Sequence, residues 1–101
     1  METDVLNILV SGAIWRAEQL ETLGFASAQR AWMEVASLEA ELAKALPASS
    51  PEGRIARRGA VRAALKAGDF THAQNLAASY LNDTPTMRND LRRILDEDAR
   101  S

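Results

Sequence analysis

Apolar residues recur at helical spacing along the chain and never alternate with polar ones, which argues against strands. The clearest case is one narrow stripe near the C-terminus, formed by Met87, Leu91, Ile94 and Leu95. The pattern predicts five helices, over about 4–23, 27–46, 51–67, 69–82 and 85–98. Gly24 and Gly68 mark helix ends, and Thr84-Pro85 marks a helix start. We therefore expect an all-α fold of two antiparallel helical hairpins and a closing C-terminal helix.

The loop that separates the two halves is the stretch 47–53, which holds two of the three prolines. It is too short to divide independent domains, so residues 1–101 should form one helical domain, with an N-terminal hairpin over 1–46 and a second hairpin and closing helix over 54–101. One helix running through Gly24 is an alternative. It would be about 65 Å long at 1.5 Å per residue, which a small domain could not cover.

Composition narrows the fold and the chemistry. Of the 101 residues, 19 are alanine and none is cysteine, so the core should consist of closely packed helices without disulfides or thiolate metal sites. No apolar run is long enough to cross a membrane, and the N-terminal apolar stretch lacks the features of a signal peptide. We expect a cytoplasmic protein. The net charge of −2 divides into −5 over residues 1–53 and +3 over residues 54–101.

Residues 54–85 resemble one tetratricopeptide repeat, a 34-residue helical hairpin. The segment KAGDF at 66–70 is similar to the turn of that family, and Ala73 and Pro85 match its small residue and closing proline. Arg57, Ala60 and other positions depart from the family pattern. Independently of the family, five alanines share one arc of the predicted 51–67 helix and should be buried where helices cross: Ala56, Ala60, Ala63, Ala64 and Ala67.

A basic stripe is the first candidate site. Its residues are Arg54, Ile55, Arg58, Arg62, Leu65 and Lys66, a mixture of positive and aliphatic side chains with no acid among residues 54–66. The tetratricopeptide resemblance implies that these positions line a concave groove that would bind an acidic peptide or an amphipathic helix. The alternative is a solvated helix face that balances the acidic first half.

The second candidate is an interface centred on the first helix, which is apolar around most of its circumference. Its residues, with one from the second helix, are Val5, Leu6, Ile8, Leu9, Val10, Ile14, Trp15 and Trp32. Such a helix must be buried on nearly all sides, which favours a homo-oligomer or a protein partner. The alternative is a central helix that the other four surround.

Two charged positions of the first hairpin, Arg16 and Glu39, also have expected locations. Arg16 should lie opposite Glu34 across an antiparallel hairpin. Glu39 falls inside the apolar arc of the second helix, where it either lies at a rim and faces a basic partner or, as we expect, is an ordinary exposed glutamate.

The sequence argues against an enzyme. His72 is the single histidine and no phosphate-binding loop or nucleophile motif is present, so we expect no catalytic residue, metal or cofactor. We expect a protein–protein interaction module, an adaptor or a small chaperone-like assembly subunit. Helical-repeat modules of this kind include small chaperones of bacterial secretion systems. The alternative is a homodimeric helical protein with a regulatory or nucleic-acid-contacting role, although the acidic pI of about 5.3 argues against nucleic acid.

Overall fold

The computed structural model describes residues 2–101, which form five helices and no strand. The helices are α1 (Thr3–Thr22), α2 (Ala28–Ala45), α3 (Pro51–Lys66), α4 (Phe70–Tyr80) and α5 (Pro85–Arg100). The all-α prediction is confirmed. The alternative of one long N-terminal helix is wrong, because the chain reverses at Gly24, whose φ of +76° suits a glycine.

Side chains at the helix starts explain why three of the helices begin where they do. In each, an oxygen accepts a hydrogen bond from the backbone N–H three residues later; the capping residues are Ser50, Asp69 and Thr84. Helix α1 starts at Thr3, one residue earlier than predicted, and the preceding Glu2 forms no side-chain cap. Helix α3 starts at Pro51, so the connecting loop is shorter than 47–53.

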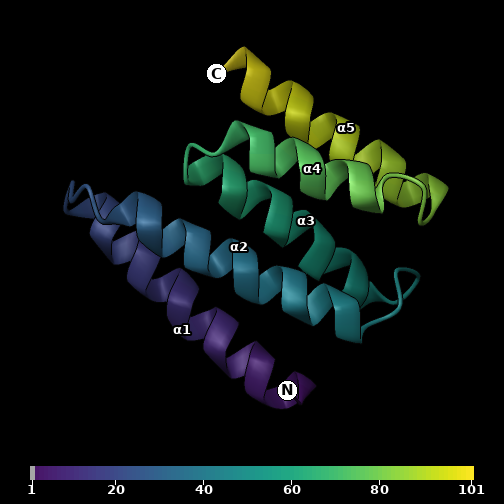
Figure 1. Ribbon diagram of the computed structural model, residues 1–101, viewed down its shortest axis with the longest axis horizontal. Helices are drawn as coiled ribbons and strands as arrows, with labels where there is room; N and C mark the ends of the chain where they lie inside the picture. Colours follow the sequence, from purple (N-terminus) through teal and green to yellow (C-terminus); the bar gives the residue numbers. More distant parts are fainter. Residues whose placement is uncertain (1) are drawn as a thin grey trace.

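The helices lie side by side in chain order and form a slab of 38 × 35 × 17 Å (Figure 1). In its backbone packing, α1 lies against α2 alone, whereas α3 lies against α2, α4 and α5. Helix α1 therefore forms one edge of the slab, and the alternative of a central helix surrounded by the other four is wrong. Helix α5 forms the opposite edge (Figure 1).

The alanine arc of α3 is buried as predicted. Ala56, Ala60 and Ala64 have no exposed surface, and Ala63 and Ala67 are also buried. Because alanine is small, the backbones of α2 and α3 can approach closely. Larger side chains, among them Val35, Met87 and Leu91, fill the remaining core.

The only phenylalanine of α4 lies outside the core. Phe70, the aromatic residue of the predicted turn, is 46% exposed, whereas Ala73 and Ala77 on the same helix are buried. Phe70 is the first residue of α4, next to the capping Asp69, and at this position its side chain lies beyond the edge of the helix contact.

Candidate interaction surfaces

Helix α1 has an uncovered apolar face, which we call the α1 outer face and define by Val5, Ile8, Leu9 and Trp15. Ile8 is 72% exposed and Trp15 is 66% exposed, and Val5 and Leu9 are also exposed. The pattern follows from the helical period, because a single neighbour buries only one stripe of a helix. In α1 that stripe is Leu6, Val10, Ala13 and Ala17.

Three of the predicted interface residues belong instead to the core of this chain. Leu6, Val10 and Trp32 are buried, so they cannot contact a partner, and Ile14 is half-buried against the same core. The indole Nε1 of Trp32 donates a hydrogen bond to Oε2 of Glu21, at 2.6 Å. This bond satisfies the only polar atom of the indole and ties α2 to α1.

Arg16 and Glu34 lie opposite each other as predicted, and they form an ion pair. The guanidinium of Arg16 on α1 donates to the carboxylate of Glu34 on α2, and both side chains are about half exposed. An exposed pair of this kind contributes little to stability, but it confirms the register of the α1–α2 hairpin.

The basic stripe lies along α3. Some of its side chains are exposed, whereas others are partly covered or are bound by residues of α5. Ile55, Arg62 and Lys66 are exposed, whereas Arg54, Arg58 and Leu65 are half-buried. The Nε atom of Arg58 is buried without a hydrogen-bond partner among residues 2–101.

Arg54 is not free to bind a partner, because it is engaged by an acid of α5. Its Nε donates to Asp90 Oδ2 at 2.6 Å and its Nη2 donates to Asp90 Oδ1 at 3.1 Å. Arg93 donates to the same carboxylate at 3.3 Å. Asp90 is buried, and the hydrogen bond from Arg54 holds the pKa of its carboxyl below the ordinary value. This part of the stripe joins α3 to α5.

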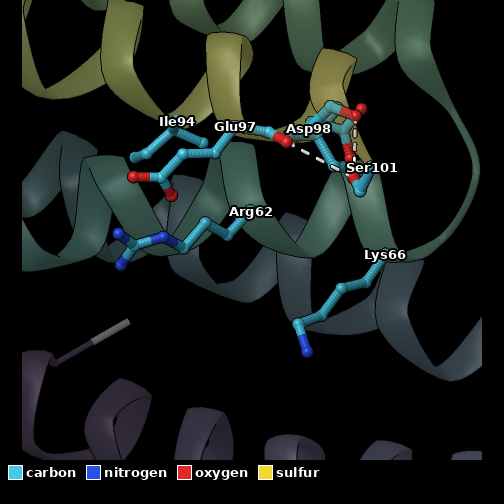
Figure 2. Close-up of a pocket in the computed structure, with 7 residues that line it drawn as sticks. Arg62, Lys66, Ile94, Glu97, Asp98 and Ser101 are labelled. Carbon is cyan, nitrogen blue, oxygen red and sulfur yellow. Dashed lines mark hydrogen bonds between the residues drawn. The ribbon is translucent and has the colours of Figure 1, made fainter.

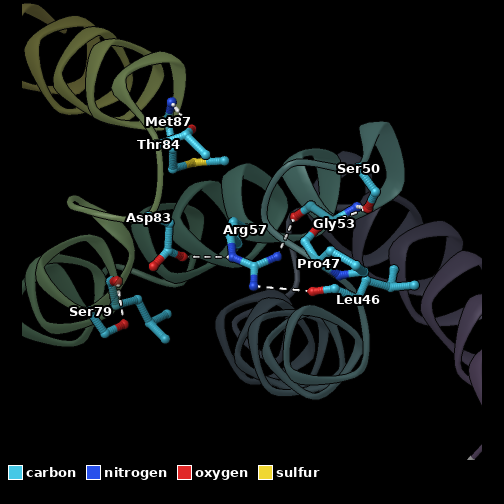
Figure 3. Close-up of polar contacts among 10 residues, drawn as sticks. Leu46, Pro47, Ser50, Gly53, Arg57, Ser79, Asp83, Thr84 and Met87 are labelled. Carbon is cyan, nitrogen blue, oxygen red and sulfur yellow. Dashed lines mark hydrogen bonds and ion pairs between the residues drawn. The ribbon is translucent and has the colours of Figure 1, made fainter.

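Arg57, the remaining arginine of α3, is a buried structural residue (Figure 3). Its three guanidinium nitrogens donate to Asp83 Oδ2 at 3.0 Å, to the Gly53 carbonyl at 3.0 Å and to the Leu46 carbonyl at 3.2 Å. The guanidinium carbon also lies 5.6 Å from the centre of the Tyr80 ring. Arg57 therefore holds together the end of α2, the start of α3 and the loop after α4.

A shallow groove of about 250 Å³ separates α3 from α5 and contains the free end of the basic stripe (Figure 2). Arg62, Leu65 and Lys66 line it from α3, and Ile94, Glu97 and Asp98 line it from α5. Among residues 2–101, neither Arg62 nor Lys66 forms an ion pair. The Nζ atom of Lys66 lies 4.7 Å from the centre of the Trp32 ring, a cation–π geometry. The groove thus carries both charge signs.

A second groove, of about 230 Å³, lies between α1 and α3 and contains Glu39 of α2. The expectation of an ordinary exposed glutamate is wrong, since Glu39 is only 6% exposed. Burial raises the pKa of its carboxyl to about 7. Sequence reasoning located Glu39 within the apolar arc of its helix, but the position of α3 over that arc was needed to show its burial.

The structure offers no centre for metal chemistry among residues 2–101, because no three His, Cys, Asp or Glu side chains gather there. His72 lies in the first turn of α4, and its backbone N–H donates to the capping Asp69. Within the same residues, no helix has the length and apolarity that a bilayer-spanning segment needs.

Comparison of the chain with protein-family models, with curated proteins and with solved structures finds no match. The tetratricopeptide resemblance of residues 54–85 therefore stays a prediction.

Proposed function

We propose that this protein is a non-enzymatic protein–protein interaction module of the cytoplasm, an adaptor or assembly subunit that binds an amphipathic helix of a partner. The observation that carries the proposal is the α1 outer face, where Ile8 and Trp15 are mostly exposed. Clustered large apolar side chains on a small protein are typical of interaction sites. Buried aromatic and aliphatic anchors supply most of the binding energy in such contacts.

The arrangement of the slab favours a helix as the occupant. Each inner helix of the slab has a neighbouring helix on both sides. Helix α1, at one edge, has a neighbour on one side only, and its uncovered side is apolar. The opposite edge ends in charged residues, since Arg92, Arg93 and Glu97 of α5 are exposed. In stacked helical proteins a polar terminal helix closes the stack. The α1 edge lacks such a closing helix, and a helix from a partner would supply it.

Charge indicates which helix would bind. Helix α1 holds three acids, Asp4, Glu18 and Glu21, and one base, Arg16, which is already paired with Glu34. A second copy of the chain would bring two negative helices together, and like charges across an interface are unfavourable. A partner helix with an apolar face and basic flanks would be complementary.

We expect the single substitution Ile8→Glu to abolish this binding while the fold is retained. Selection of a displayed library of helical peptides on the wild-type protein should enrich peptides with apolar residues at i, i+3 or i+4, and i+7 and with Lys or Arg beside them. Affinity for a synthetic copy should fall roughly tenfold or more in Ile8→Glu, because a charge replaces a central anchor.

The matched control is Phe70→Glu, which places the same charge on another exposed apolar residue away from α1 and should not change the affinity. Absence of enrichment, or equal binding by Ile8→Glu, would contradict the proposal. Sedimentation of the wild-type protein tests whether a second copy of the chain covers this face instead. A dimer that Ile8→Glu dissociates would show that a second copy covers this face.

The α3–α5 groove is a second candidate, for an acidic peptide. The observation that favours it is that Arg62 and Lys66 are exposed, form no ion pair among residues 2–101, and line the groove beside the aliphatic Leu65. A carboxylate-bearing peptide could pair with Arg62 through two parallel hydrogen bonds.

Charge reversal at Arg62 tests this second candidate. We expect Arg62→Glu to reduce the affinity of acidic peptides selected from the same library by roughly tenfold, with the helical circular dichroism unchanged. The control is Arg92→Glu, which reverses an exposed charge on the outer side of α5. Equal loss in both variants would indicate a nonspecific charge effect and would contradict a defined groove.

A further inference from the structure

The α1–α3 groove brings together two carboxylates and a set of aliphatic side chains. Helix α2 forms its floor, and α1 and α3 form its walls. Its main residues are Asn7, Ser11 and Ile14 of α1, Glu39 and Leu42 of α2, and Glu52 and Ile55 of α3. Among residues 2–101, no arginine, lysine or histidine lines it, so its described lining is acidic and apolar.

Glu39 lines the groove as a carboxyl group without a partner. Only 6% of its surface is exposed, so the residue is 94% buried. Among residues 2–101 no hydrogen bond reaches its carboxyl group, and the five ion pairs do not include it. The charged form of a buried, unpaired carboxyl is costly. Four of the eight bases of α1, α2 and α3 form ion pairs with other acids: Arg16 with Glu34, Lys44 with Glu41, Arg54 with Asp90, and Arg57 with Asp83.

The space for this carboxyl depends on Gly59 of α3. A Cβ atom at Gly59 would lie 1.6 Å from Oε2 of Glu39 and 2.7 Å from its Cδ. Any other residue at position 59 would therefore displace the carboxyl group. The glycine and the glutamate are complementary across the α2–α3 contact, and together they keep a negative group beside the groove.

The shape and chemistry of the groove fit one cationic side chain with an apolar stem. Its volume of about 230 Å³ is below the roughly 300 Å³ at which pockets for small-molecule ligands begin. Ile14 and Ile55 can contact methylene groups, and Glu39 and Glu52 can accept hydrogen bonds from a cationic head. A guanidinium is better suited than an ammonium, because it is more weakly hydrated and binds carboxylates through two parallel bonds. We propose that the α1–α3 groove is a receptor site for an arginine side chain of a partner protein.

This site adjoins the α1 outer face along α1, but the two share no residue. The arginine site can thus be correct whether or not a helix binds the α1 outer face. The natural partner is not needed for its test, since the probe is a blocked amino acid, Nα-acetyl-arginine amide. The neutral analogue Nα-acetyl-citrulline amide has nearly the same shape and serves as the ligand control.

The experiment is a titration of the full-length ¹⁵N-labelled protein followed by two-dimensional NMR at pH 8. We expect the arginine probe to cause saturable shifts confined to the amides around Asn7, Ser11, Glu39 and Ile55, and the citrulline probe to cause none. Glu39→Gln should weaken binding by roughly tenfold or more, because one charged hydrogen-bonding partner is lost. Glu41→Gln, which removes an exposed carboxylate from the same helix, should leave the affinity unchanged.

Gly59→Ala is a second variant that keeps every charge. Its methyl group displaces the Glu39 carboxyl, so we expect the same loss of arginine binding without a change in net charge. The proposal is overturned if shifts fail to saturate, if they spread over the whole surface, or if citrulline or Glu39→Gln gives the wild-type response. It is also overturned if Ca²⁺ or Mg²⁺ alone reproduces the shifts and displaces the arginine probe, since the groove would then be a metal site.

Discussion

Replacing Arg57 with methionine should lower the free energy of unfolding by about 3 kcal/mol at neutral pH. The guanidinium is buried and donates to Asp83 and to the carbonyls of Leu46 and Gly53. Methionine has a similar length and no donor, so it leaves two carbonyls and one carboxylate without this partner. Unpaired polar groups in such a position cost more than the original hydrogen bonds contributed. Urea unfolding followed by circular dichroism measures the change.

The control for Arg57 is Arg92→Met, because Arg92 is exposed on α5 and forms no ion pair within residues 2–101. This change should alter the free energy of unfolding by less than about 0.5 kcal/mol. A loss of similar size in both variants would mean that net charge, rather than the buried contacts, stabilises the fold. A negligible loss in Arg57→Met would contradict the structural role that we assign to the guanidinium.

The alanine arc and the helix ends could be predicted because they depend on local physics. A helix exposes residues to a neighbour every three to four positions, so alanines at that spacing on α3 predicted a close contact with another helix. Gly24, Gly68 and Thr84 act through the backbone of their own turn. That Arg16 lies opposite Glu34 could also be predicted from the sequence, because a short turn fixes the register of an antiparallel hairpin.

The sites themselves were harder to predict, because each depends on which helices become neighbours. The basic stripe is continuous in the sequence, yet Asp83 and Asp90, which engage Arg57 and Arg54, come from the loop after α4 and from α5. The apolar circumference of α1 indicated a partner or a surrounding bundle, but only the helix order shows that α1 is an edge helix. That order turns Leu6 and Val10 inward and leaves Ile8 uncovered.

Glu39→Gln should stabilise the protein at alkaline pH and have almost no effect at acidic pH. Burial raises the pKa of the Glu39 carboxyl from 4.5 to about 7 in the folded chain. Between these values the folded chain holds a proton that the unfolded chain has released, so the stability of the wild type falls as pH rises. At about 1.4 kcal/mol per pKa unit, the loss amounts to about 3 kcal/mol once the pH exceeds 7. Glutamine resembles the protonated carboxyl and does not titrate, so the variant avoids this loss.

The measurement is the difference in free energy of unfolding between Glu39→Gln and wild type from pH 4.5 to pH 8. It should grow from near zero to about 3 kcal/mol in favour of glutamine. All other titratable groups are the same in both proteins, so their contributions cancel in the difference. Exposed Glu18→Gln on α1 is the control and should give a flat difference. A flat difference for Glu39→Gln would mean that water or a cation reaches the carboxyl, whereas a rising one would show that Glu39 keeps its proton in the folded chain until the pH approaches 7.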